Sequence, residues 1–273
     1  MSVKKEDSGR RSIQVEVEVP GTPEEVWQAI ATGPGVSSWF VPTEFEEGEG
    51  KPVAVRMNFG PGMESRAEVT VWDPPRTFAA ESPGWTPEMP GMATEWIVEA
   101  RAGGVCLVRV VNSLFASTDD WDNQLEGTEK GWPGFFRTLR IYLTHFRGQR
   151  SALMQKMAPV MATEAEAWER LTAALGLKGV GAGQRVTAAD APALSGVVEH
   201  ATEKPYDILL RLDRPGPGVA AVGAFNCGGP IMVALNLFLY GEAATGTVAR
   251  ERPLWDAWFE KHFPMPTEAG KSG

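Results

Sequence analysis

Hydrophobic and polar residues alternate along several short segments of the first half of the chain, and helical spacing replaces this alternation near its start and end. RSIQVEVEV at 11–19 has a period of two, which is typical of a strand with one buried face. In the next motif, TPEEVWQAI, Thr22 and Glu25 form a capping box and Pro23 takes the first helical position, so we expect a helix over 23–31. Alternation and turn residues then predict a short helical turn and five strands in a meander, at 34–40, 52–58, 63–72, 76–82, 92–100 and 105–112.

An aromatic helix is expected at GWPGFFRTLRIYLTHF, residues 131–146. Its apolar residues follow helical spacing and form one stripe: Trp132, Phe135, Phe136, Leu139, Tyr142, Leu143 and Phe146. Because proline is tolerated without loss only in the first turn, Pro133 predicts that the helix begins near 129–132. Core packing is the usual reason for such a stripe. The many other rings and methionines of this half favour the alternative, one wall of an apolar cavity.

Several motifs of the first half recur in the same order in the second half. The matched segments are 11–19 with 150–160, 22–30 with 163–171, 68–81 with 198–212, and 102–115 with 227–240. An aromatic helix closes each copy, at 131–146 and at 253–263, and we expect the small, polar segment 241–251 to be a loop. The repeat predicts two domains of one α+β fold, 11–148 and a shorter 149–265.

Composition and charge narrow the classes of function. With 43% hydrophobic and 22% charged residues the chain resembles ordinary globular proteins, and its longest apolar runs are too short to span a bilayer. No charged-then-apolar leader opens the chain, so we expect a cytoplasmic protein. The net charge of −9 argues against nucleic acid as a partner. Two cysteines, Cys106 and Cys227, cannot frame a disulfide scaffold or a zinc site, and we expect buried thiols.

No residue pattern marks a catalytic centre. The three histidines, His145, His200 and His262, lack metal-ligand spacing, so neither a metal nor another cofactor is expected, and no catalytic residue is assigned. Asp119, Asp120, Asp122 and Glu126 crowd the segment before the last helix of the first half. Their spacing lacks the plan of a calcium loop, so capping and solvation of the helix entry are favoured over a cation site.

The ordered motifs resemble one known family. The strand followed by TPEEVW, the VTVWDPPR hairpin, the VRVVNS strand and the GW..FF..L..YL helix are similar to the START-like (SRPBCC) superfamily, and most similar to the bacterial branch related to the activator of the ninety-kilodalton heat-shock protein's ATPase. The resemblance covers 11–148, and 149–265 is a degenerate second copy. It implies a helix-grip fold, in which a curved antiparallel sheet wraps a long C-terminal helix and often leaves a cavity. Family members are mostly small-ligand binders, lipid carriers, polyketide cyclases or chaperone cofactors.

The first functional hypothesis is non-catalytic binding of a small hydrophobic molecule in the first domain, in a cavity of roughly 300–1,000 Å³. Asn112 shares strand parity with Val110, and Thr94 with Trp96, so both would face the cavity as polar anchors. The segment 81–92 would cover its mouth. The expected ligand-binding residues are Trp39, Phe59, Met63, Thr94, Trp96, Asn112, Trp132, Phe136, Leu139 and Leu143.

Two further hypotheses stay open. The family branch and the paired domains suggest a chaperone cofactor or stress-related interaction module, with a chaperone or a second copy of the chain as partner. An enzyme of the polyketide cyclase or dehydratase kind would instead fold a reactive substrate in the cavity, largely by positioning it.

Overall fold

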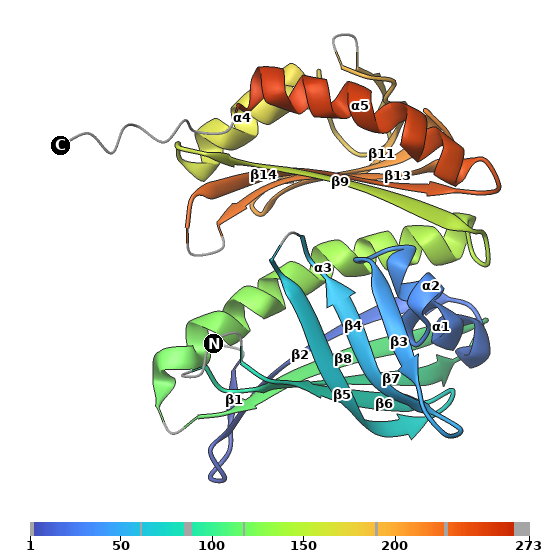
Figure 1. Ribbon diagram of the computed structural model, residues 1–273, viewed down its shortest axis with the longest axis vertical. Coiled ribbons are helices and arrows are strands. Elements are labelled where there is room, and N and C mark those ends of the chain that lie inside the picture. The colour runs from blue at the N-terminus through green and yellow to red at the C-terminus, as the bar shows by residue number, and fades with distance from the viewer. Residues whose placement is uncertain are drawn as a thin grey trace. The chain divides into compact units, whose positions relative to one another are not determined.

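The computed structural model describes residues 3–60, 62–84, 89–116, 118–188, 191–226 and 229–264. The chain divides into two compact units, Met1–Gly148 and Gln149–Gly273 (Figure 1). Both units combine an antiparallel sheet with helices. None of the described helices is long and apolar enough to cross a membrane.

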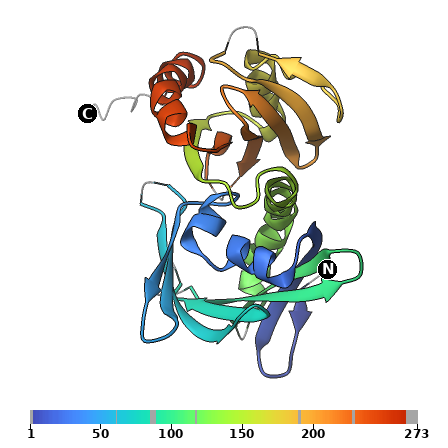
Figure 2. The same cartoon turned by 90° about the vertical axis from the view of Figure 1, so that its right-hand side faces the viewer.

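The first unit is a curved antiparallel sheet wrapped around one long helix. Its strands are β1 (Lys4–Lys5), β2 (Arg10–Pro20), β3 (Thr43–Glu47), β4 (Pro52–Asn58), β5 (Glu64–Asp73), β6 (Thr77–Ser82), β7 (Met92–Arg101) and β8 (Val105–Phe115). Its helices are α1 (Pro23–Ile30), α2 (Gly33–Ser37), the 3₁₀ turn η1 (Asp119–Trp121) and α3 (Asp122–His145). The strands lie in the order β1-β2-β8-β7-β6-β5-β4-β3, and Figure 2 shows the sheet curving around one side of α3.

The second unit repeats this topology with fewer strands. Its elements are β9 (Ser151–Val160), α4 (Glu164–Ala174), β10 (Arg185–Thr187), β11 (Ser195–Glu203), β12 (Tyr206–Arg214), β13 (Gly218–Asn226), β14 (Ile231–Tyr240) and α5 (Ala244–His262). In each unit the first long strand pairs with the last one, β2 with β8 and β9 with β14, and the meander continues outward from there. The predicted fold class, a duplicated helix-grip fold of the α+β class, is confirmed.

The same capping box starts the first helix of each unit. In α1, Thr22 N donates to Glu25 Oε2 (2.9 Å) and Glu25 N donates to Thr22 Oγ1 (3.3 Å). In α4, Thr163 and Glu166 repeat both bonds at the same distances. Each box satisfies two backbone donors that a helix N-terminus otherwise leaves unpaired. The capping boxes predicted from the sequence therefore mark the starts of α1 and α4 to the residue.

The start of α3 was predicted wrongly. The helix begins at Asp122, so Pro133 lies in its interior and removes one internal hydrogen bond. Tertiary contacts hold the turns before the proline in place: Leu125 is fully buried, and Asp122 is ion-paired to Arg11 on β2. In α3 these contacts outweigh the cost of the interior proline.

The segment 241–251 of the second unit is also not the expected loop. Helix α5 begins at Ala244 and contains Pro253, as α3 contains Pro133. Ala244, Val248 and Glu251 are buried along one face of its first turns. This buried face includes a glutamate and only one large apolar residue, so the sequence pattern does not reveal it.

An ion-pair cluster joins the entry of α3 to the edge of the sheet. The guanidinium of Arg11, which is nearly buried, donates to Asp119 Oδ1 and Asp122 Oδ1, both at 2.6 Å. Lys5 Nζ approaches the other carboxylate oxygens, at 3.0 Å from Asp119 and 2.8 Å from Asp122. These carboxylates therefore form ion pairs that hold the start of α3 against the sheet. Within the described residues no cluster of acidic, histidine or cysteine side chains is arranged to hold a metal ion.

This cluster makes the stability of the first unit depend on acid pH. Hydrogen bonds from Lys5 and then Arg11 lower the pKa of Asp122 below its ordinary value of 3.8. A lowered folded-state pKa gives stability that is present above the ordinary value and lost as the pH falls through the folded-state value. We expect Asp122→Asn to be less stable than wild type at pH 5–7 and to approach it below about pH 4.

Urea unfolding of the two proteins across this pH range measures the difference. Asp120→Asn is the matched control, because Asp120 accepts a hydrogen bond from Thr118 Oγ1 and stands outside the cluster. An Asp122→Asn deficit that stays constant down to pH 3 would contradict the ion-pair explanation.

Candidate functional site

A buried chain of polar groups connects the sheet to α3. Trp132 Nε1 on α3 donates to Asn112 Oδ1 on β8 at 2.7 Å. Asn112 Nδ2 in turn donates to Thr94 Oγ1 on β7 at 2.8 Å. Thr94 and Asn112 are directly paired across the two strands, and Asn112 is only 2% exposed. We call these three residues the Trp132–Asn112–Thr94 network.

The alternation of β8 explains why Asn112 faces inward. Val108 and Val110 are fully buried, and Asn112 continues their side of the strand. Arg109 lies on the other face, where Nε donates to Glu16 (2.6 Å) and Nη1 to Glu99 (3.0 Å). The orientation that strand parity predicts for Asn112 and Arg109 is thus the one the strand adopts.

Aromatic rings surround the network. The Trp132 ring centroid lies 5.2 Å from Trp96, 5.4 Å from Phe136 and 5.7 Å from Phe40. Trp39 meets Trp96 edge to face at 6.1 Å. Edge-to-face and offset pairs of this kind contribute about 0.5–1.5 kcal/mol each beyond area burial. We call these five residues the ring cluster.

The network is a specific polar feature within this apolar environment. Both hydrogen-bonding groups of the Asn112 amide are engaged, so the side chain has one defined orientation. The Thr94 hydroxyl accepts a hydrogen bond from Asn112 Nδ2, and its own hydrogen can be donated to a further acceptor. Chemically, the arrangement offers an oriented hydroxyl beside a wall of rings.

The other predicted site residues lie at different depths. Leu139 and Leu143 are fully buried on α3, along the same helix as Trp132 and Phe136. Phe59 is half-buried beside Phe40, with ring centroids 5.8 Å apart. Met63 is 42% exposed in the turn between β4 and β5, so it is not among the buried walls. Of the expected cover 81–92, residues 85–88 lie outside the described residues.

Of the two cysteines, only Cys106 lies among the described residues. Cys106 is fully buried on β8, its Sγ lies 3.3 Å from the carbonyl oxygen of Gly21, and burial raises the pKa of its thiol. It is therefore an inert core thiol, as its sequence context predicts. Cys227 lies outside the described residues.

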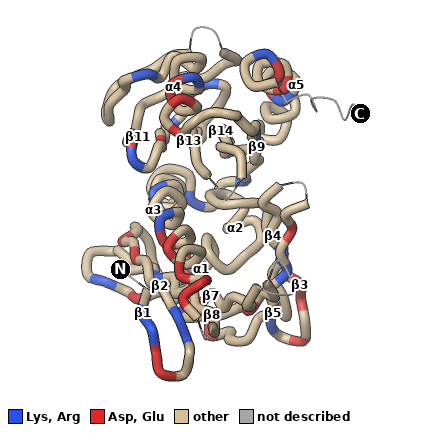
Figure 3. Tube along the Cα trace, turned by 90° about the vertical axis from the view of Figure 1, so that its left-hand side faces the viewer, with Lys and Arg blue, Asp and Glu red and all other residues tan. Residues whose placement is uncertain are grey.

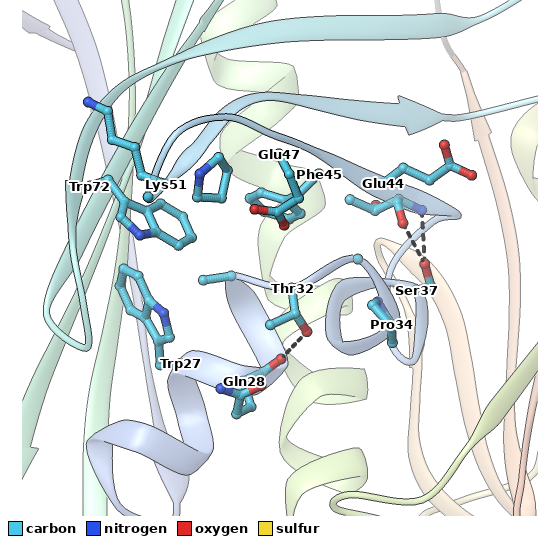
Figure 4. A pocket seen from close by; sticks show the side chains of 15 residues that line it. Trp27, Gln28, Thr32, Pro34, Ser37, Glu44, Phe45, Glu47, Lys51 and Trp72 are labelled. Atoms are coloured by element: carbon cyan, nitrogen blue, oxygen red, sulfur yellow. Dashed lines mark hydrogen bonds between the residues drawn. The ribbon is translucent and has the colours of Figure 1, made fainter.

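A second feature, which the sequence did not reveal, is an open pocket of about 750 Å³ in the first unit (Figure 4). It lies between α1, α2, β3 and β5, and we call it the α1–β5 pocket. Its walls include Trp27 from α1, Phe45 from β3 and Trp72 from β5. Its remaining lining residues are Gln28, Ala31, Thr32, Gly33, Pro34, Ser37, Thr43, Glu44, Glu47, Gly50, Lys51 and Pro52.

Phe78 links the α1–β5 pocket to the ring cluster. Its ring lies 5.8 Å from both Trp27 and Trp72, and 6.1 Å from Phe45. On its other side it stacks on Trp96 at 6.1 Å with nearly parallel planes. Aromatic side chains therefore pack in an unbroken series from the α1–β5 pocket to α3. The buried ring of Phe78 stands between the pocket and the ring cluster.

Within its described residues, the second unit has no counterpart of the Trp132–Asn112–Thr94 network. In the sequence repeat 102–115 with 227–240, Leu237 stands where the first unit has Asn112. Trp255 on α5 is fully buried, and its Nε1 has no hydrogen-bond partner among the described residues. The oriented polar group is thus a property of the first unit.

Comparison with known proteins shows which family the first unit resembles. The family model described as "Polyketide cyclase / dehydrase and lipid transport" matches residues 10–142. The match covers nearly all of the first unit and just under half of the chain, and it confirms the START-like (SRPBCC) resemblance that the sequence motifs predicted. The chain matches no curated protein sequence.

Several solved structures are similar to the chain. The di-domain ARO/CYC protein BexL from the BE-7585A biosynthetic pathway is 12% identical, with 94% of this chain and 100% of that chain covered at a TM-score of 0.45. DynU16, from the dynemicin biosynthetic locus, is 18% identical, with 90% and 98% covered at 0.40. The Aha1 dimer from Colwellia psychrerythraea is 22% identical, with 50% and 98% covered at 0.39.

Proposed function

We propose that the first domain binds a small hydrophobic molecule, without chemical change, between its sheet and α3. The Trp132–Asn112–Thr94 network carries this proposal, because it holds one hydroxyl in a fixed orientation within an apolar environment. Binding sites for small molecules typically combine apolar walls with a few placed polar groups. The molecule would lie against Trp96, Trp132 and Phe136, with Leu139 and Leu143 behind them, and would accept a hydrogen bond from Thr94.

The family description supports a second candidate, cyclisation or dehydration of a bound substrate. In that case the same rings would hold a flexible substrate in a reactive conformation, and positioning would supply much of the rate enhancement. The two candidates share a binding site and differ in whether the bound molecule leaves unchanged.

Native mass spectrometry of the freshly purified full-length protein tests the proposal. We expect a co-purifying organic molecule on the wild type, and a lower occupancy on Thr94→Val, which keeps the side-chain shape but removes the hydroxyl. Loss of one hydrogen bond, about 0.5–1.5 kcal/mol, corresponds to roughly two- to tenfold weaker binding. Thr70→Val, at an exposed position on β5, is the matched control and should retain the molecule.

The outcomes separate the candidates. A molecule that is recovered unchanged after prolonged incubation supports binding, and conversion into a cyclised or dehydrated product supports the enzyme. Equal occupancy of Thr94→Val and wild type would contradict the assigned role of the network.

A further inference from the structure

The α1–β5 pocket presents three aromatic side chains at one end. Trp27 and Trp72 meet edge to face with centroids 5.1 Å apart, and Phe45 lies 6.0 Å from Trp72. Trp27 is buried, whereas Phe45 and Trp72 are half-buried and reachable from the opening. The volume of about 750 Å³ falls in the usual range of small-molecule sites.

Acidic groups dominate the charge around these rings. Strand β3 and its turn are rich in glutamate (Figure 3). Glu46 accepts hydrogen bonds from Arg66 and Arg56, which lower its pKa to about 2, so its charge is already compensated. Glu44 and Glu47 line the pocket and have no ion-pair partner among the described residues.

The close view shows how the charged side chains are directed. The Glu47 carboxylate lies toward the middle of the pocket, near Phe45 (Figure 4). Lys51, a basic residue of the lining, extends outward past Trp72 (Figure 4). The interior of the pocket therefore combines aromatic faces with an uncompensated negative charge.

The second unit carries a smaller opening at the matching place. Its pocket of about 190 Å³ is lined by Trp168 and Thr172 of α4, at the positions that Trp27 and Ala31 occupy in the repeat. In the repeat 68–81 with 198–212, Thr202 stands at the position of Trp72. An opening beside the first helix thus occurs in both units, and the one in the first unit is larger and is lined by a second tryptophan.

We infer that the α1–β5 pocket is a second ligand site, which binds a small organic cation carrying an aromatic group. Tryptophan faces attract cations, and the attraction grows when the cation is partly removed from water. Glu47 supplies the countercharge and the rings supply apolar contact for the rest of the ligand. Phe78 separates this site from α3, so the inference does not depend on the ligand proposed there.

Calorimetric titration of the full-length protein with benzyltrimethylammonium tests the inference. Neopentylbenzene is its uncharged counterpart of the same shape and isolates the contribution of the charge. We expect wild type to bind the cation at least tenfold more tightly than the neutral compound. Trp72→Thr, which installs the residue of the second unit, should weaken cation binding at least tenfold, and Glu47→Gln should weaken it several-fold.

Glu49→Gln is the matched control, because Glu49 is exposed in the turn that directly follows Glu47 but does not line the pocket. It removes the same net charge and should leave the affinity within twofold of wild type. Glu47→Gln changes an exposed side chain, so it reports on the site even if Trp72→Thr fails to fold.

Three results would overturn the inference: no binding of the cation by wild type, equal affinity for the neutral counterpart, or unchanged affinity in Glu47→Gln and a folded Trp72→Thr. None of these results bears on the molecule proposed to lie under α3, which is followed by native mass spectrometry and Thr94→Val.

Discussion

Truncation of Trp132 to alanine is expected to lower the free energy of unfolding of the first domain by about 3–5 kcal/mol. The indole contacts Trp96, Phe136 and Phe40, so its removal leaves a large void between α3 and the sheet. It also leaves the side-chain oxygen Oδ1 of the buried Asn112 without its hydrogen-bond donor. Differential scanning calorimetry of the full-length chain measures the loss in the transition of this domain.

A comparison of two phenylalanine variants isolates the hydrogen bond. Trp132→Phe and Trp255→Phe remove the same atoms from buried positions on two helices, but among the described residues only the Trp132 indole has a hydrogen-bond partner. We expect Trp132→Phe to cost about 1–3 kcal/mol more than Trp255→Phe, since only the former orphans a buried acceptor. Equal costs would show that the Trp132–Asn112–Thr94 network adds nothing to stability beyond packing.

The second large effect is expected at Gly35, in α2. A Cβ added there would lie 1.9 Å from the carbonyl oxygen of Gln28 and 2.9 Å from the Cα of Ala29, both backbone atoms of α1. Gly35→Ala must therefore push α2 away from α1, and overpacking of this kind costs about 1–3 kcal/mol or more. Because Pro34 and Ser37 of α2 line the α1–β5 pocket, the variant should also weaken cation binding there.

Gly127→Ala is the matched control for this substitution. Gly127 lies within α3, and a Cβ added there meets nothing within 4 Å. Alanine has the higher helix propensity, so we expect this variant to be more stable than wild type by about 0.5–1 kcal/mol. A Gly35→Ala protein as stable as Gly127→Ala would contradict the close α1–α2 contact.

The parts of the fold that could be predicted are those whose structure is determined by residues close together in the sequence. Thr22 and Glu25 define a helix start by their own side chains, and Thr163 and Glu166 repeat it, so neither depends on distant contacts. The inward orientation of Asn112 follows from strand parity, which a sheet with one buried face enforces. Its partner Trp132 lies on another element, the helix α3, and its partner Thr94 lies on the neighbouring strand β7. Only the folded chain shows that hydrogen bonds join the three side chains.

The errors occur where tertiary contacts outweigh local preference. Pro133 was read as a helix start, yet Arg11, more than a hundred residues earlier, holds the preceding turns through Asp122. Strand β3 carries three glutamates in five residues, and its pairing with β4 overrides that low strand propensity.

The α1–β5 pocket escaped prediction for a related reason. Trp27 and Trp72 belong to recognised motifs, a helix start and a strand before a turn, and each has an ordinary structural role by itself. Their meeting requires the curvature of the sheet, which brings β5 toward α1. The available signal was the repeat, because Thr202 replaces Trp72 in the second copy and marks it as dispensable for the fold.

The most direct test of the proposed ligand site is the ¹H–¹⁵N spectrum of the tryptophan indoles in the full-length protein. The bound molecule recovered by mass spectrometry, or the hydrophobic probe 1-anilinonaphthalene-8-sulfonate, is titrated into the apo protein. Binding between the sheet and α3 predicts that the indole signals of Trp39, Trp96 and Trp132 shift together and saturate, while that of Trp255 stays in place. Saturable shifts confined to Trp27 and Trp72, or to the second domain, would contradict the account.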